Sequence, residues 1–278
     1  MLKYAISNIA FSPEQKEEIY KLISNHGFSG LEIAPSLFLD GAKLPYEVEI
    51  EELAKQKKLA NDAGLELVSM QSLLFGVQNL FLFESEKSRK DLLNYCKKAI
   101  DFAATLQIPN LVFGSPNNRI IPDSLSEKEA NKIAVAFFKE LGEYAYSKKT
   151  ILAMEANSSK YGGNFITKTS QAISLIKEVN SPGFKLNLDM GTMSLENEEN
   201  DIICEEIIPL INHIHICEGF LKPIYEGNHV IHKQRAKIIK NSSYDKYLSI
   251  EMKSADVSDN VEHVKRALEF VEVNYINS

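Results

Sequence analysis

The sequence predicts an α/β protein, a single (β/α)8 TIM barrel that spans residues 1–278. Eight short apolar runs alternate with eight longer amphipathic stretches. Such alternation requires parallel strands joined by helical crossovers, and eight units fit a closed barrel. A doubly wound open sheet is the alternative, but residues 8–12 follow the first run without the glycine-rich phosphate turn of that fold.

The predicted strands are the short apolar runs, which read as buried segments. In chain order they cover residues 3–7, 30–34, 65–71, 110–115, 151–155, 185–189, 213–217 and 248–251.

The predicted helices carry apolar residues at steps of three and four. They cover residues 13–25, 47–63, 86–106, 126–147, 168–179, 201–210, 232–240 and 259–273. Ser12 and Pro13 suit the N-cap and first position of the first helix. Gly64 stands where a glycine would end the second helix.

The alternation of side chains along the later strands favours a barrel over an open sheet. Successive strand residues point to opposite faces, so Leu152 and Met154 share one face while Ala153 and Glu155 share the other. The strands at 185–189, 213–217 and 248–252 repeat this pattern, with one apolar face each. A parallel sheet covered by helices on both faces would be apolar on both, so a barrel with a polar C-terminal rim fits better.

Composition limits the classes of function. The chain is 44% hydrophobic and 25% charged, which is typical of a globular protein. Its net charge is −7 and no basic block occurs, so no nucleic-acid partner is expected. No apolar run of about 18 residues and no signal-peptide pattern is present, so we expect a cytoplasmic protein without a membrane span. Three scattered cysteines argue against a disulfide framework.

Four side chains of metal-ligand type stand at or near the ends of the last four predicted strands, all on the inward face: Glu155, Asp189, His215 and Glu251. Closure of the barrel would bring these ends to one side of the rim. Three carboxylates and one imidazole suit Mn²⁺, Mg²⁺, Co²⁺ or Zn²⁺, with positions left for substrate. The pattern predicts one divalent metal ion. A charge network without metal is the alternative, although buried acids without cations are costly.

The segments that carry these residues, 152–157, 188–191, 213–218 and 249–253, resemble the sugar phosphate isomerase/epimerase superfamily. These xylose-isomerase-like TIM barrels include ketose 3-epimerases and endonuclease IV, and the resemblance covers nearly the whole chain. It implies that Glu155, Asp189, His215 and Glu251 bind one ion, with manganese the first choice. It also implies that Glu155 and Glu251 form the catalytic acid/base pair.

Three positions depart from that superfamily. Thr192 replaces a histidine that many members carry, which argues against the multi-metal chemistry of endonuclease IV. Tyr161 and Leu221 stand where ketose 3-epimerases usually place a second glutamate and an arginine. The resemblance therefore predicts the reaction class of this protein better than it predicts the substrate.

Six residues are candidates for substrate binding: Glu32, Gln71, Asn157, Glu218, Arg119 and Lys253. Glu32 and Gln71 are expected to point into the barrel. Asn157 and Glu218 follow the expected ligands Glu155 and His215. Arg119 and Lys253 could face a phosphate or carboxylate group of the substrate. Each candidate has a structural alternative. Glu32 could form a salt bridge at the rim, Asn157 could stabilise a turn, and Glu218 could be an ordinary acid of a loop. Arg119 and Lys253 could be ordinary surface residues. The apolar loop 73–83 suggests either a cover for the site or a subunit contact, which would allow a homo-oligomer.

The predicted function is a metal-dependent sugar or sugar phosphate isomerase/epimerase. It would remove a proton next to a carbonyl through a metal-stabilised enediolate, so its partner is a small-molecule carbohydrate. A metal-dependent sugar-acid or cyclitol dehydratase is the first alternative. An endonuclease IV-like hydrolase and a non-catalytic sugar-binding barrel are less favoured.

Overall fold

The computed structural model describes residues 2–40, 42 and 45–277. Its strands form a closed barrel in chain order, and every neighbouring pair is parallel. The strands are β1 (Lys3–Ser7), β2 (Gly30–Ile33), β3 (Glu66–Met70), β4 (Asn110–Phe113), β5 (Ile151–Glu155), β6 (Phe184–Asp189), β7 (Ile211–Cys217) and β8 (Tyr247–Glu251). This architecture confirms the predicted (β/α)8 barrel.

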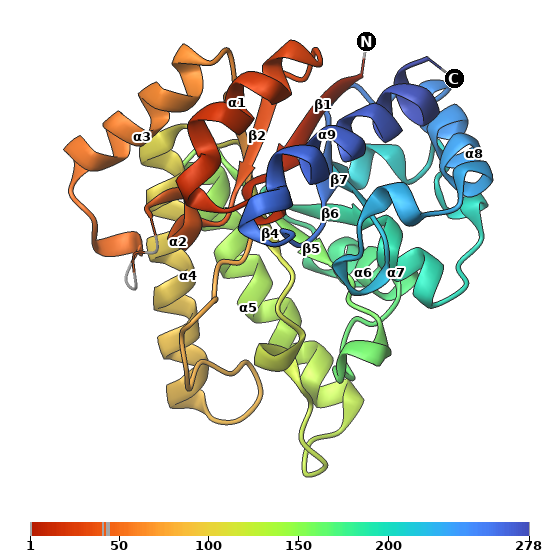
Figure 1. The fold of residues 1–278 in the computed structure, drawn as a ribbon. Helices are drawn as coiled ribbons and strands as arrows, with labels where there is room; N and C mark the ends of the chain where they lie inside the picture. The colour runs from red at the N-terminus through yellow and green to blue at the C-terminus, as the bar shows by residue number, and fades with distance from the viewer. Residues whose placement is uncertain (1, 41, 43–44, 278) are drawn as a thin grey trace.

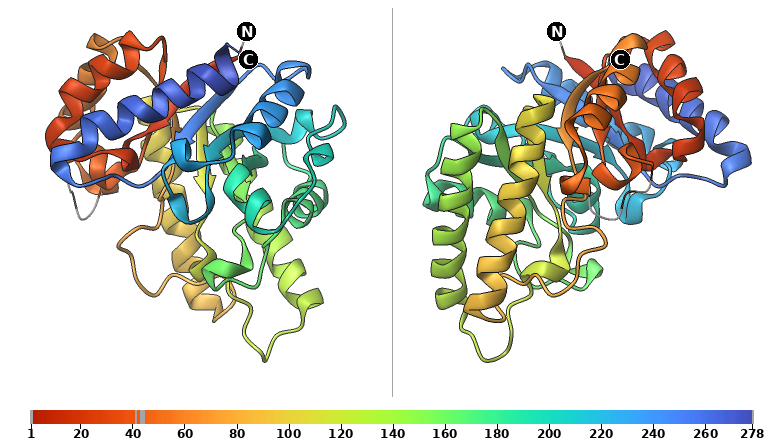
Figure 2. Two further views of the ribbon diagram at one scale, coloured as in Figure 1. Left: turned by 45° about the vertical axis from the view of Figure 1, so that its right-hand side comes forward. Right: turned by 90° about the vertical axis from the view of Figure 1, so that its left-hand side faces the viewer.

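Helices surround the barrel (Figure 1). They are α1 (Lys16–Asn25), α2 (Pro35–Phe38), α3 (Ile50–Asp62), α4 (Glu86–Leu106), α5 (Glu127–Ser147), α6 (Thr169–Val179), α7 (Met190–Leu195), α8 (His229–Lys240) and α9 (Asn260–Val271). The two 21-residue helices, α4 and α5, lie side by side (Figure 2).

The first and last elements of the chain close the barrel. Strand β1 pairs with β8, and α1 packs against α9. The hydroxyl of Tyr4 donates a hydrogen bond to the carbonyl of Tyr275 at 3.2 Å. The two termini consequently lie close together at the top of the molecule, and the loops that precede α4 and α5 extend from its lower end (Figure 1).

The predicted helix at 201–210 is wrong. That segment holds only the 3₁₀ turns Asn200–Ile202 and Ile208–Leu210, and Pro209 has no N–H to donate within a helix. The helix α7 instead begins directly after β6. Asp189 caps it, because its Oδ1 accepts a hydrogen bond from the Thr192 backbone N–H at 2.5 Å.

The predicted helix boundaries at Ser12 and Gly64 have different outcomes. Gly64 follows the end of α3 with a φ of +83°, so the expected glycine stop is confirmed. Ser12 precedes a 3₁₀ turn, Pro13–Gln15, and its hydroxyl contacts the Glu14 carboxylate. Ser12 and Pro13 thus take the expected N-cap and first positions, but at this 3₁₀ turn, and the Ser12 side chain makes no capping hydrogen bond.

The inward faces of the strands carry polar groups that bond between neighbouring strands inside the barrel. Asn110 Nδ2 donates to Ser69 Oγ at 2.9 Å, and His213 Nε2 lies 3.0 Å from Ser249 Oγ. Register shifts occur at Leu31/Glu32 and at Leu186/Asn187. Such irregularities re-aim side chains, and both stand next to residues of the site described below.

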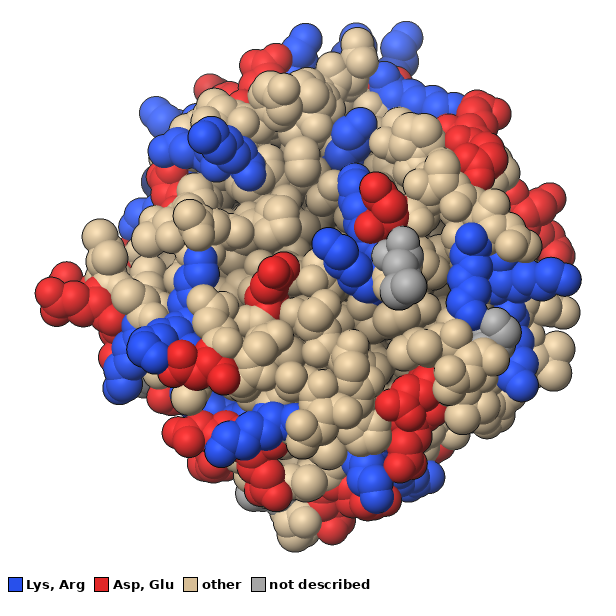
Figure 3. All heavy atoms as spheres, turned by 90° about the horizontal axis from the view of Figure 1, so that it is seen from above, with Lys and Arg blue, Asp and Glu red and all other residues tan. Residues whose placement is uncertain are grey.

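No helix in the described part of the chain is long and apolar enough to span a bilayer. On the face seen from above, basic and acidic side chains are interspersed (Figure 3).

Candidate metal centre and active site

Four buried side chains converge at the C-terminal ends of the last four strands. Single ligand atoms of Glu155, Asp189, His215 and Glu251 all lie within 4.8 Å of one another. His215 Nδ1 is 3.1 Å from Glu155 Oε2, 3.3 Å from Glu251 Oε2 and 3.8 Å from Asp189 Oδ2. The structure thus brings together the four residues that the sequence predicts as ligands.

Strand pairing explains this convergence. Asp189 pairs with His215 across β6 and β7, and Cys217 pairs with Glu251 across β7 and β8. Glu155, at the end of β5, pairs with Asn187. Because the strands are parallel and their side chains alternate, inward residues at these paired positions meet above the barrel interior.

The Glu155 carboxylate is held in a fixed orientation. Asn157 Nδ2 donates to its Oε1 at 2.6 Å, and Asn187 Nδ2 donates to its Oε2 at 2.7 Å. Gly114 makes room for it, because a Cβ at that position would lie 2.5 Å from Oε1. A larger residue at 114 would therefore displace the carboxylate.

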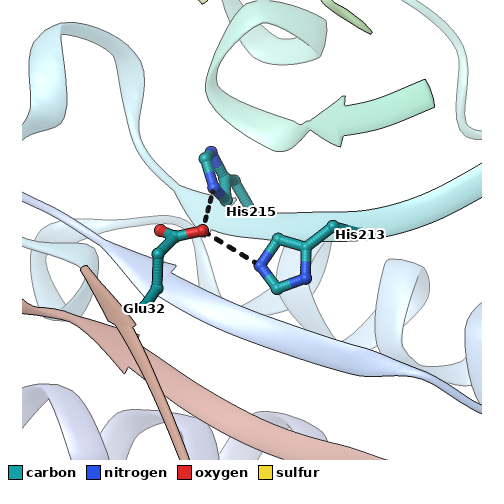
Figure 4. Close-up of side chains that lie close together, drawn as sticks. All are labelled: Glu32, His213 and His215. Atoms are coloured by element: carbon teal, nitrogen blue, oxygen red, sulfur yellow. Dashed lines mark hydrogen bonds and ion pairs between the residues drawn. The ribbon is translucent and has the colours of Figure 1, made fainter. Parts of the chain in front are cut away.

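Behind His215, Glu32 links two imidazoles (Figure 4). Its Oε2 lies 3.1 Å from His215 Nε2 and 3.2 Å from His213 Nε2. Burial alone would raise the pKa of Glu32, but the two histidines hold it well below its usual range. A fully buried, ionised carboxylate therefore orients the ring of His215.

Bound positive charge would stabilise this cluster, as the raised pKa values of Glu251, Asp189 and His215 indicate. Burial raises the pKa of Glu251 to about 7 against the pull of His215, and burial together with Glu155 raises that of Asp189. Burial opposes protonation of His215, yet Glu251 and Glu32 raise its pKa well above the usual range.

A divalent cation fits this donor set. Three carboxylates and one imidazole can offer oxygen and nitrogen ligands to it, and its charge would relieve their mutual repulsion.

The three carboxylates of the cluster border a cavity of about 310 Å³, a volume at the lower end of the range for small-molecule sites. Glu155, Asp189 and Glu251 line it together with Cys217. Of the residues predicted to bind substrate, Gln71, Asn157 and Glu218 line the cavity as well.

Glu32, Arg119 and Lys253 are not among the residues that line the cavity. Arg119 is fully buried, and its NH2 group donates at 2.8 Å both to the Glu155 carbonyl and to Asn157 Oδ1. Lys253 is exposed after β8. Glu32 and Arg119 thus act as buried supports, whereas contact of Lys253 with substrate stays a prediction, because its backbone N–H bonds to the carbonyl of Leu221, which lines the cavity.

Sequence reasoning missed two supporting residues. Asn187 had the right inward parity, but nothing in its sequence context indicated that it would hold Glu155. His232, on α8, places its Nε2 2.8 Å from Glu218 Oε1 and so fixes that carboxylate at the edge of the cavity. Only the packing of α8 against the barrel reveals this contact.

Solved structures with the same fold cover nearly all of the chain. The apo 3-keto-D-glucoside 4-epimerase of E. coli has a TM-score of 0.77 and 18% identity, covering 98% of this chain and 100% of its own. The D-allulose 3-epimerase of Methylomonas sp., bound to D-allulose, has a TM-score of 0.76 and 18% identity, covering 99% and 97%. The probable 3-DHS dehydratase of Bacillus anthracis has a TM-score of 0.70 and 17% identity, covering 98% and 99%.

No curated protein sequence matches the chain significantly. The family model described as xylose isomerase-like TIM barrel matches residues 20–272, which include all four clustered residues. The barrel, its rim site and this match agree, and the chain belongs to the xylose isomerase-like TIM barrel family.

Proposed function

We propose that the protein is a sugar isomerase or epimerase that removes and returns a proton on the carbon next to a substrate carbonyl. The observation that carries this proposal is the convergence of Glu155, Asp189, His215 and Glu251 beside one small cavity, which the three carboxylates line. Structures that share its fold include enzymes named as sugar epimerases, which supports the reaction class without identifying the sugar.

The four clustered residues would hold one divalent cation, with Mn²⁺ the first choice. When bound, such an ion polarises a carbonyl and offsets the negative charge that develops during proton removal.

Glu155 and Glu251 are the proposed proton-transfer groups. They end β5 and β8, with Asp189 and His215 contributed by the strands between them. A carboxylate on each side of a bound sugar can take a proton from one face and return it to the other. Asn157 and Asn187 fix the Glu155 oxygens, so that the carboxylate is oriented before substrate enters.

The remaining polar residues of the cavity would orient the sugar hydroxyls. Glu218 faces the cavity with its carboxylate held by His232, and Asn157 contributes an amide. Tyr161 lies at the same cavity, with its hydroxyl fixed by the Phe220 backbone N–H at 2.7 Å. These fixed groups lower the entropy lost when substrate is positioned.

The test is a panel of sugars incubated with the protein and Mn²⁺ in D₂O and followed by NMR. We expect deuterium at the carbon next to the carbonyl, together with an epimer or an aldose–ketose isomer. Loss of water from the sugar would indicate a dehydratase instead. Product formed without solvent deuterium would indicate hydride transfer or a shielded proton and remove the exchange step from the proposal.

A further inference from the structure

The charged side chains that the described residues contribute to the cavity are all carboxylates: Glu155, Asp189, Glu218 and Glu251. One divalent cation would supply two positive charges against these four negative ones. A ligand in the cavity therefore faces carboxylate oxygens and no cationic side chain among the described lining residues, and the low dielectric of the partly buried site strengthens the effect of these nearby charges.

The guanidinium group nearest to the cluster is already bonded within the protein. Arg119 donates from Nε to the Phe165 carbonyl at 3.1 Å and from NH2 to the Glu155 carbonyl at 2.8 Å. It also donates to Asn157 Oδ1 at 2.8 Å. Turning this group toward a ligand would leave buried oxygens without donors, which is costly.

The guanidinium group of Arg235, on α8, is likewise bonded within the protein, to residues of α7. It is buried, and its NH1 group donates to the Met190 carbonyl at 3.0 Å and to Ser194 Oγ at 3.1 Å. Its Nε donates to Asn200 Oδ1 at 3.0 Å. Both arginines thus stabilise the rim and face protein oxygens.

The rest of the lining suits a neutral polyol. Asn117 supplies an amide group that can exchange hydrogen bonds with hydroxyls. The amides of Gln71, Asn118 and Asn157 also line the cavity, but they already donate within the protein, to Glu32, the Leu80 carbonyl and Glu155. Only their remaining donor and acceptor sites would meet a sugar. Leu74, Phe75, Val112 and Leu221 supply apolar surface for the C–H groups of a sugar. The cavity volume of about 310 Å³ matches a ligand of monosaccharide rather than oligosaccharide size.

We infer that the substrate is an uncharged monosaccharide and that the cavity rejects sugars carrying a phosphate or carboxylate group. This inference rests on the proposed function, and it narrows the substrate class of that same site. The four carboxylates would provide the rejection, since they would repel an anionic group that meets no cationic side chain among the described lining residues.

The experiment compares ketohexoses with their 6-phosphates and 6-carboxylates on the Mn²⁺-loaded protein, with Mn²⁺ in excess. Binding is measured by saturation-transfer NMR and turnover by solvent deuterium. We expect the neutral sugars to be preferred by about 100-fold or more. Raising the salt concentration should tighten the weak binding of the anions and leave that of the neutral sugars unchanged, because salt screens repulsion.

A pair of variants tests the electrostatic cause. Leu221→Arg adds a cation to the cavity lining and should improve binding of the 6-phosphate at least tenfold. Val273→Arg adds the same charge at an exposed position beyond α9 and should leave the preference unchanged.

The outcomes separate the two ideas. Equal or tighter binding of the anionic sugars, or binding of anions that weakens with salt, overturns the neutral-substrate inference even if deuterium exchange occurs. Preferential binding of neutral sugars without deuterium exchange supports the inference on charge and overturns the proposed proton-transfer function. Failure of every sugar to bind overturns both.

Discussion

His215 Nε2 lies 3.1 Å from Glu32 Oε2, and both side chains are fully buried. Glu32 stands on β2 and His215 on β7, so this contact crosses the barrel interior. When a metal displaces the proton from Nδ1, the carboxylate would keep the other proton on Nε2, and the Nδ1 lone pair would be directed toward Glu155, Glu251 and Asp189. The contact therefore sets the ring nitrogen that would bind a metal.

Removing the charge of Glu32 should weaken metal binding without changing the ligand set. We expect Glu32→Gln to lower Mn²⁺ affinity by about 10- to 100-fold, the usual effect of losing a carboxylate behind a histidine ligand. Calorimetric titration measures it, and Glu66→Gln, an exposed acid on β3, is the matched control. Unchanged affinity in Glu32→Gln would show that this carboxylate does not support His215 as a ligand.

Glu155→Gln and Glu251→Gln should each lower turnover by about 10²–10⁴-fold, because the amide keeps an oxygen but cannot accept the proton. Metal affinity should fall by a smaller factor. Steady-state kinetics on the active sugar and metal titration provide the two readouts, with Glu143→Gln on the exposed face of α5 as control. Near-normal turnover in both variants would exclude them as the proton-transfer pair.

Arg119 should contribute to stability more than its charge alone suggests. Arg119→Met removes the donors to the Glu155 and Phe165 carbonyls, and we expect a loss of about 2–4 kcal/mol in the free energy of unfolding. Urea denaturation measures this loss. The control is Arg266→Met, since that exposed guanidinium only stacks on Tyr225, at 3.8 Å from the ring centroid, and should cost about 1 kcal/mol or less. Equal losses in the two variants would contradict this role.

The three thiols should differ in reactivity. Burial raises the pKa of Cys96 to about 12, and burial and Asp189 raise that of Cys217 well above its usual value. Only Cys204 is exposed, so Ellman's reagent at pH 8 should modify one thiol in the folded protein and three after unfolding. Cys204→Ser should reduce the native count to zero. Rapid native modification of Cys217 would show that the cavity exposes this thiol.

Alkaline pH should destabilise the fold. Burial raises the pKa of Tyr4 from 10.0 to about 12, so between these values the unfolded chain loses this proton while the folded protein keeps it. Its contribution to stability is therefore present below pH 10 and is lost as pH rises through 12. Urea midpoints from pH 8 to 12 measure the decline, which should be smaller in Tyr4→Phe. An identical decline in both proteins would assign the effect to other groups.

The sequence by itself determined the barrel and the four clustered residues. Strand parity and position are local properties, so Glu155, Asp189, His215 and Glu251 could be placed at inward strand ends before any pairing was known. The same local signals failed at 201–210, where helical periodicity persisted through Pro209 although the chain forms only short turns. There, the tertiary path between β6 and β7 overrode the local pattern.

The tertiary structure alone decided which polar residues face the cavity and which support it. Arg119 was a candidate for a substrate anion or for an ordinary surface position, yet it is buried and donates to carbonyls from residues more than thirty positions away. Glu32 was a candidate for a sugar hydroxyl or for a structural salt bridge at the rim, and it lies between two histidines of β7. The alternation of side chains predicts the face of the strand on which a residue lies. It does not predict how deep that residue lies in the barrel or which residues of other strands it contacts. Those depend on register shifts, loop paths and helix packing, which involve contacts between residues distant in the chain.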